Sequence, residues 1–173
     1  MITNQQSHQS YDDVDMAILT LLQKDSTTTN SKLAKQIGLS PSACLGRTKR
    51  LKEAGIIKQF VAIVDAEKVG LEVVTFVFVS LDPHDRKTTE AFLESIRAIP
   101  SIMECHNISG VHDFLLKVIA PSISAYRNFV IDTLIEVPGV GKIETSVILS
   151  SEKLSYQLPL SESRLWNKPA KPL

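Results

Sequence analysis

A short segment, residues 40–51, combines residue types that suit contact with duplex DNA. Ser40 is expected to cap a helix through its hydroxyl, and Pro41 suits the first helical position, where a missing N–H costs nothing. Small and cationic side chains then fall on the outward face: Ser42, Gly46, Lys49 and Arg50, flanked by Ala43 and Arg47. The opposite face carries Cys44, Leu45, Thr48 and Leu51. Small residues let a backbone approach a duplex while long cations reach phosphates and guanine edges, so the segment predicts a recognition helix.

The charge distribution supports this interpretation, although the formal net charge of the whole chain is zero at pH 7. Between residues 30 and 58 the charged side chains are almost all cationic: Lys32, Lys35, Arg47, Lys49, Arg50, Lys52 and Lys58, opposed by Glu53. A local basic patch in a neutral protein is typical of a nucleic-acid-binding domain joined to a domain with another task. We expect Arg50 to read base edges, and Lys49 and Arg47 to hold the phosphate backbone.

Helices are expected to position this segment. Asp12 or Asp13 caps the first helix, whose inner face repeats apolar residues at helical spacing: Val14, Ile18, Leu21 and Leu22. A second helix at about 31–37 ends at Gly38, and Leu39 and Ser40 complete a tight turn into the third helix, which ends near Gly55. This arrangement predicts a helix-turn-helix.

After Gly55 the pattern changes to that of an α+β domain. Runs rich in Val, Ile and Phe predict strands at about 56–65, 73–81, 103–109, 112–120 and 140–149. Helices are expected at about 88–98 and 122–137, and Gly110 and Val111 form a short hairpin connection. From residue 73 onward the order is β-α-β-β-α-β, which is ferredoxin-like.

The expected organisation is therefore an α+β chain with two domains and a linker. We assign a helix-turn-helix DNA-binding domain to 12–56, a linker strand and hinge to 57–72, a ferredoxin-like ligand-binding and oligomerisation domain to 73–158, and tails to 1–11 and 159–173. Trp166 is unusual in such a tail, and docking on the body or on a partner chain is one explanation.

The strand at 73–81 is apolar on both faces, with Val77 on one and Phe78 on the other. Two helices cover only one face of a four-stranded sheet, and an apolar face of that size is not left exposed to water. A symmetric sheet-on-sheet homodimer is the simplest solution. It also presents two recognition helices to a two-fold symmetric duplex.

Bulk features favour a cytoplasmic protein that does not enter a membrane. The N-terminus lacks a secretion signal, and the apolar stretch from Val73 to Leu81 is too short to span a bilayer. Cys44 and Cys105 fall in different predicted domains, so we interpret them as buried apolar residues rather than as a disulfide. We expect no cofactor, no metal site and no catalytic group.

The chain resembles the Lrp/AsnC family of bacterial and archaeal feast/famine regulators. In the first half the resemblance rests on residues 33–45, 50–51 and 55–56; in the second half it rests on 104–106, 109–117, 124–127 and 138–140. Two independent motif sets in the right order make it specific. The chain departs from the common family pattern at Gly46, where many relatives carry a long polar residue.

The resemblance implies that the second domain binds a small effector, usually an amino acid, between subunits. The pocket would lie near the hairpin, where Ser109 and backbone N–H groups at Gly110 hold a carboxylate and Asp113 takes an ammonium group. The remaining expected effector residues are His112, Ile123, Thr145 and Ser146. The family often assembles rings of four dimers, so an octamer is open. A plainer interpretation is that Gly110 turns the hairpin and Asp113 caps it.

Two rival functions stay open at this point. Some haem-pathway decarboxylases resemble the same two-domain plan, and His106 or His112 would then act as an acid or a ligand. Against an enzyme, the histidines lack metal-ligand helical spacing, and no nucleophile–base pair is evident. The other rival is a ligand-binding module that no longer binds DNA. The cationic stripe of Arg47, Lys49 and Arg50 favours the transcriptional regulator.

Overall fold

The computed structural model describes residues 11–160, so Trp166 and most of both expected tails lie outside the described residues. The chain forms two compact units. One contains the described residues up to 62 together with 153–160, and the other contains residues 63–152. Each unit has its own apolar core.

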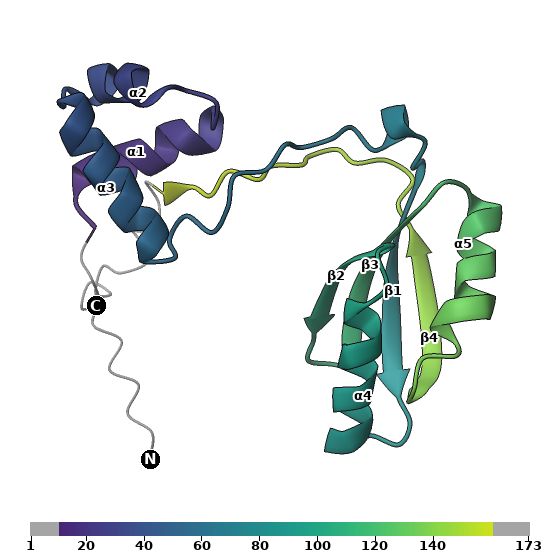
Figure 1. Cartoon of the computed structure of the whole chain (residues 1–173). Helices are drawn as coiled ribbons and strands as arrows, with labels where there is room; N and C mark the ends of the chain where they lie inside the picture. Colours follow the sequence, from purple (N-terminus) through teal and green to yellow (C-terminus); the bar gives the residue numbers. More distant parts are fainter. Residues whose placement is uncertain (1–10, 161–173) are drawn as a thin grey trace, which may run out of the picture. The chain divides into compact units, whose positions relative to one another are not determined.

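The first unit is helical and has the expected helix-turn-helix order (Figure 1). Helix α1 spans Asp13–Lys24, α2 spans Asn30–Ile37 and α3 spans Pro41–Glu53. Asp12 caps α1, and Ser40 caps α3 by accepting the Ala43 N–H. Gly38 ends α2 with φ +72°, a left-handed conformation that glycine adopts at little cost.

The core of this unit places α3 as expected, with one exception. Cys44 and Leu51 are fully buried against Ile18 of α1 and Leu33 of α2. Leu45, which we expected on the inward face, is 58% exposed. The reason is angular: Cys44 and Leu51 define the buried direction, and Leu45 lies roughly 100° around the helix from Cys44.

The segment 153–160 returns to the helical unit. The side-chain amide of Gln23 in α1 forms two hydrogen bonds with the backbone of Leu158. The Gln23 Oε1 accepts the Leu158 N–H at 2.7 Å, and the Gln23 Nε2 donates to the Leu158 carbonyl at 3.4 Å. Leu160 packs against the helical core. The chain after the last strand is therefore anchored on the helical unit.

The second unit is the expected ferredoxin-like fold. Its elements follow in the order β1 (Val73–Leu81), α4 (Arg86–Arg97), β2 (Ile102–Asn107), β3 (Phe114–Ala120), α5 (Ile123–Phe129) and β4 (Val140–Val147). The strands form an antiparallel sheet in the order β2-β3-β1-β4. The β1 bounds are those that the sequence predicts, and the other strands shift by one or two residues at their ends.

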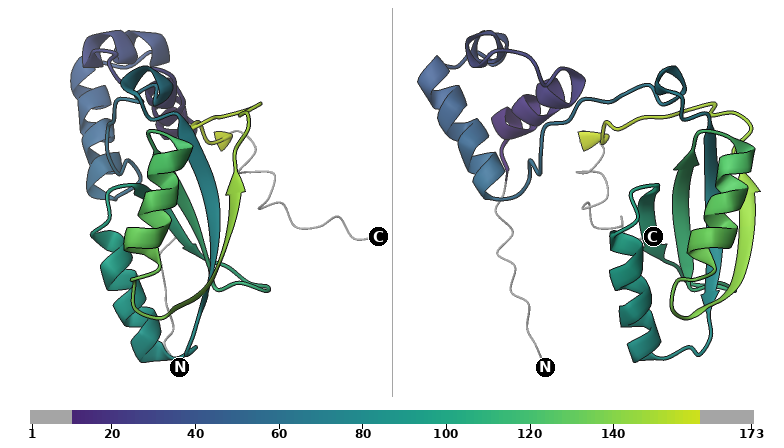
Figure 2. Two further views of the ribbon diagram at one scale, coloured as in Figure 1. Left: turned by 90° about the vertical axis from the view of Figure 1, so that its right-hand side faces the viewer. Right: turned by 45° about the vertical axis from the view of Figure 1, so that its right-hand side comes forward.

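Both helices pack on one face of this sheet (Figures 1 and 2). Beneath them Thr75, Val77, Val79 and Leu81 of β1 are buried, together with Phe92 of α4 and Tyr126 of α5. The alternate residues of β1, including Phe76 and Phe78, are only half-buried on the other face. The two-sided apolar pattern of β1 thus corresponds to one packed face and one open face.

Two predicted elements are wrong. The segment 56–65, which the structure describes in full, forms no strand; Phe60, Val61, Ile63 and Val64 remain exposed. A strand needs a hydrogen-bonded neighbour, and no ladder in the described chain includes this segment. The linker at 57–72 therefore contains no strand, and its one regular element is a 3₁₀ turn, Glu67–Val69.

The second error is the single helix at 122–137. Helix α5 ends at Phe129 and continues as a π-helical turn, η2 (Val130–Leu134), closed by the Ile135 N–H on the Val130 carbonyl at 3.0 Å. A π-turn inserts an extra residue and shifts the buried face, which simple periodicity does not show. Ile123, which helical periodicity over 122–137 places on the apolar face, is 57% exposed.

Candidate DNA-binding and effector sites

The exposed surface of α3 has the expected small residues. Ser40, Ser42, Ala43 and Gly46 are exposed, and Ser40 and Ser42 lie within 3.2 Å of each other through their hydroxyls. A Cβ added at Gly46 would meet no atom within 4 Å in the free protein. Nothing inside the described fold therefore demands glycine there, and the helix backbone is open to an approaching duplex.

Three cations of α3 lie beside carboxylates, and the sequence did not indicate the two arginine pairs. Lys49 is 73% exposed and lies 3.6 Å from Glu53, one turn along α3. Arg47 donates to Asp12 at 2.7 Å and to Asp15 at 2.9 Å, both on α1 or at its cap. Arg50 donates to the other oxygen of Asp15 at 2.5 Å. Arg47 and Arg50 are therefore tied to α1 rather than extended freely into solvent.

Asp12 connects the capping box of α1 to this cluster. Its side chain accepts the Asp15 N–H at 2.8 Å, and both of its oxygens accept from Arg47. The Asp15 N–H and then the Arg47 guanidinium hold the pKa of Asp12 below its usual range, because both stabilise the carboxylate. The start of α1 and the cationic side of α3 form one hydrogen-bonded cluster: Asp12, Asp15, Arg47 and Arg50.

The hairpin expected to hold the effector is longer than predicted and spans residues 108–113. Ser109 and Gly110 are exposed, and Gly110 has φ +131°, a conformation that favours glycine. Asp113 accepts the Leu81 N–H at 2.8 Å and pairs with His84 at 3.0 Å. Asp113 binds the end of β1 and does not belong to β3, so the loop is longer than predicted. Both oxygens of Asp113 already have partners.

His112 folds back onto the open face of the sheet. Its Nδ1 lies 3.1 Å from the Ser80 hydroxyl, its Nε2 lies 3.5 Å from Glu144, and its ring stacks at a tilt against Phe78. His106, by contrast, pairs with Glu104 on β2, at the other edge of the sheet. Leu115 of β3 lies between His106 and Phe78 in the sheet, so about two strand spacings, roughly 10 Å, separate His106 from the strand on which His112 packs. The two histidines therefore have separate partners and do not form one site.

The other expected effector residues lie elsewhere on the unit. Ile123 begins α5, beyond the end of β3 opposite the hairpin, and a strand of this length spans about 20 Å. Thr145 bonds the Tyr126 hydroxyl at 2.6 Å, whereas Ser146, the next residue on β4, points to the other face. Ile123 and Thr145 therefore lie near α5, apart from the hairpin residues, whereas Ser146 shares the open face of the sheet with His112.

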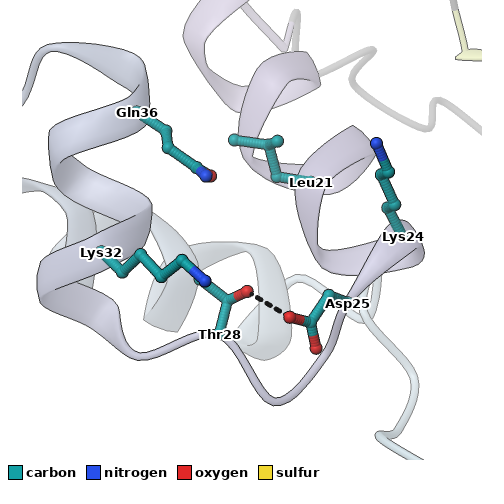
Figure 3. A pocket seen from close by; sticks show the side chains of 6 residues that line it. All are labelled: Leu21, Lys24, Asp25, Thr28, Lys32 and Gln36. Atoms are coloured by element: carbon teal, nitrogen blue, oxygen red, sulfur yellow. Dashed lines mark hydrogen bonds between the residues drawn. The ribbon is translucent and has the colours of Figure 1, made fainter.

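A shallow hollow of about 270 Å³ lies between α1 and α2 (Figure 3). It is lined by Leu21, Lys24, Asp25, Thr28, Lys32 and Gln36, and includes none of the predicted effector residues. The Thr28 hydroxyl donates to Asp25 at 2.8 Å. Hydrogen bonds from Thr27 and then Thr28 lower the pKa of Asp25, so this carboxylate is committed to the turn between the helices.

Residues 11–160 contain no helix long and apolar enough to cross a membrane. In the same range, no group of His, Cys, Asp or Glu side chains is placed to hold a metal ion.

Comparison with known proteins assigns each of the two units to a protein family. The family described as Lrp/AsnC ligand binding domain matches residues 74–158, and the winged helix-turn-helix DNA-binding family matches residues 11–58. Transcriptional regulator AzlB of Bacillus subtilis (strain 168) is 46% identical over 151 residues, which cover 87% of this chain and 96% of AzlB. The chain belongs to the Lrp/AsnC family of transcriptional regulators.

Other relatives agree with this assignment. The leucine-responsive regulatory protein of Escherichia coli (strain K12) is 36% identical over 85% of this chain and 90% of its own. A transcriptional regulator of Neisseria meningitidis, solved in complex with L-methionine, has a TM-score of 0.85 and 34% identity, covering 89% of this chain and 99% of its own. The resemblance inferred from the motifs and the predicted fold class are thus confirmed. This Lrp/AsnC regulator joins a winged helix-turn-helix to an α+β ligand-binding domain.

Proposed function

We propose that this Lrp/AsnC regulator acts as a homodimer that binds specific duplex DNA through α3 and changes its DNA affinity when an amino acid binds the second domain. The observation that carries DNA binding is the exposed small surface of Ser42, Ala43 and Gly46, bordered by Lys49 and Arg50. That surface admits a duplex backbone close to α3 with cations on either side.

Within this surface we assign different roles to the cations. Arg50 reads base edges because its planar fork suits bidentate contact with guanine. Lys49, a flexible point charge, neutralises a phosphate. Arg47 is 30% exposed and already contacts the carboxylates of Asp12 and Asp15. It would therefore contact a phosphate while it stays bound to α1.

The effector site requires more than one chain. Ser109, Gly110, His112 and Asp113 lie at one end of the sheet, and Ile123 lies at the other, so a pocket built from both groups forms where two subunits meet. Thr145 belongs with Ile123 through Tyr126, and Ser146 faces the open side of the sheet. An amino acid is the favoured class because the structurally similar Neisseria regulator was solved with L-methionine.

Dimerisation through the open face supplies the second chain. The centre of this face is apolar, with Val74, Phe76, Phe78, Leu115 and Ile119 only half-buried. Charged side chains lie on the two edge strands: Glu104 of β2 pairs with Lys117 of β3, and Lys142 and Glu144 lie on β4. An apolar centre with a polar rim is the usual composition of a protein interface. An octamer of four dimers stays a prediction.

A catalytic function has less support. His106 is exposed beside Glu104, and His112 contacts Ser80 and Glu144 on the open face of the sheet. The relatives that the chain matches over most of its length are transcriptional regulators. We therefore propose a regulator rather than the alternative enzyme.

The DNA roles can be tested on a duplex selected from a random library with the full-length chain. Arg50→Ala should weaken binding to the selected site by about 1–3 kcal/mol while affecting random DNA much less. Lys49→Ala should weaken both duplexes alike and reduce the slope of log affinity against log salt by about one. Equal losses on both duplexes for Arg50→Ala would refute the assignment of Arg50 as a base reader.

A further inference from the structure

A buried carboxylate lies behind the recognition helix and is not explained by DNA contact. Asp15 of α1 is 1% exposed, and within residues 11–160 it is the one charged side chain that is buried. Removing a carboxylate from water is costly unless hydrogen bonds and opposite charges compensate for the loss. The groups that bind the Asp15 carboxylate therefore indicate the role of this residue.

Both charged partners of the Asp15 side chain come from α3. Its Oδ1 accepts from Nη1 of Arg47 at 2.9 Å, and its Oδ2 accepts from Nη2 of Arg50 at 2.5 Å. The Asp12 N–H approaches the same Oδ2 at 3.4 Å. A single fixed carboxylate thus sets the position of two guanidinium groups on the recognition helix.

The two arginines are held to different extents. Arg47 is 30% exposed and its guanidinium also contacts both oxygens of Asp12. Arg50 is 54% exposed, and its contact in the described structure is the single Nη2 bond to Asp15. Since a guanidinium carries five N–H donors, Arg50 keeps a fork of donors available on its solvent side.

We propose that Asp15 is a positioning residue for sequence readout, which holds the Arg50 guanidinium in one orientation and restrains it from binding phosphates of any sequence. The inference rests on the proposed role of Arg50 at base edges. A side chain ordered before binding loses less rotamer entropy when it meets the correct base. The adjacent negative charge also opposes a phosphate, so non-specific contacts are penalised more than specific ones.

A purely structural role for Asp15 predicts a different outcome. If the carboxylate only ties α1 to α3, its loss lowers the folded fraction and weakens all DNA binding in proportion. The ratio of specific to random affinity then stays constant. The positioning role changes that ratio, and this is the readout that separates the two.

The test compares Asp15→Asn with the wild-type chain on the selected duplex and on random duplex, by anisotropy titration at several salt concentrations. Asparagine keeps the size of the side chain but removes its charge. We expect the specificity ratio to fall by about tenfold, the random-DNA affinity to rise, and the salt slope on random DNA to steepen by about 0.9. Asp13→Asn, an exposed neighbour that loses the same charge, should leave the ratio unchanged.

Adding Arg50→Ala completes a double-mutant cycle. In that background Asp15→Asn should no longer change the ratio, because the group it positions is absent. An unchanged ratio for Asp15→Asn alone, or parallel losses on both duplexes, would overturn the proposal. If Arg50→Ala also leaves the ratio unchanged, the proposed role of Arg50 fails with it; if Arg50→Ala lowers the ratio, only the positioning role fails.

A measurement on the wild-type chain covers the case in which Asp15→Asn does not fold. Nitrogen-15 relaxation of the Arg50 side chain in the free protein should show an ordered guanidinium, more rigid than that of exposed Arg86. A freely rotating Arg50 guanidinium in the free wild-type protein would contradict the proposal.

Discussion

At the scale of single residues, side-chain types on α3 were predictable but their partners were not. Helical periodicity placed Ser42, Gly46 and Lys49 on the exposed side. It could not show that Arg47 and Arg50 reach back to Asp12 and Asp15, because that contact joins residues more than thirty positions apart. Leu45 was misplaced because it lies at the border of the two faces, where a periodic pattern discriminates least.

Gly46 offers a direct test at this scale. Glycine inside a helix costs about 1 kcal/mol relative to alanine, and the added methyl has free space, so Gly46→Ala should raise the free energy of unfolding by up to that amount. If α3 packs closely on DNA, the same methyl should weaken binding to the selected site by about 1–3 kcal/mol. Denaturant unfolding and DNA titration measure the two effects separately. A more stable variant with wild-type DNA affinity would show that the position is merely tolerant.

At the scale of elements, the ferredoxin-like unit was largely predictable and its connections were not. β1 was predictable to the residue because a continuous apolar run ends in turn residues at both sides. The segment 56–65 is also rich in Val, Ile and Phe, yet strand propensity does not supply a hydrogen-bonded neighbour. The π-turn at Val130–Leu134 and the capping role of Asp113 depend on tertiary contacts that no local pattern encodes.

The structure shows which face of β1 is open to a partner subunit, and the sequence alone did not show this. Val77 is fully buried beneath α4 and α5, whereas Phe78 lies half-buried on the open face. Phe78→Asp should give a folded monomer, because the charge enters the proposed interface. Val77→Asp should unfold the unit, because an unpaired charge enters its core.

Analytical ultracentrifugation and circular dichroism distinguish these outcomes. Val69→Asp, at an exposed apolar residue of the 3₁₀ turn, serves as the control and should keep the wild-type mass and fold. A folded dimer for Phe78→Asp, or a monomeric wild-type protein at micromolar concentration, would refute dimerisation through this face.

At the scale of the whole molecule, several carboxylates make the stability of the chain sensitive to acid. Hydrogen bonds from His106 and then Lys117 lower the pKa of Glu104 below its ordinary value of 4.5, and backbone or side-chain donors similarly lower the pKa of Asp12, Asp25 and Asp85 below 3.8. A pKa lowered by folding contributes stability above the unfolded value, and that stability is lost as pH falls through the folded value.

We therefore expect the melting temperature of the chain to stay nearly level from neutral pH to about pH 5 and to fall progressively below it. Glu104→Gln should reduce part of that dependence, whereas Glu94→Gln on the exposed side of α4 provides the matched control. Melting curves recorded by circular dichroism between pH 3 and 7 measure it. A melting temperature that rises on acidification through this window would contradict the assignment.

The two units are linked by two stretches of chain, the segment after α3 and the segment after β4 that Gln23 anchors on α1. An effector bound at the second unit therefore has covalent routes to the DNA-binding unit. Such a ligand changes DNA affinity only to the extent that it binds the DNA-competent and DNA-free assemblies differently. The coupling must be reciprocal, because it is a free energy shared by both ligands.

Coupling between amino-acid binding and DNA binding in this regulator can be measured as a change in the affinity for one ligand when the other is bound. Each of the twenty amino acids is screened for a rise in melting temperature, and the wild-type chain is titrated with its selected duplex in the presence and absence of each hit. A stabilising amino acid should shift the DNA dissociation constant about 5- to 150-fold, and saturating DNA should shift the dissociation constant of that amino acid by the same factor. An amino acid that binds without changing DNA affinity, or a screen in which none binds at millimolar concentration, would contradict it.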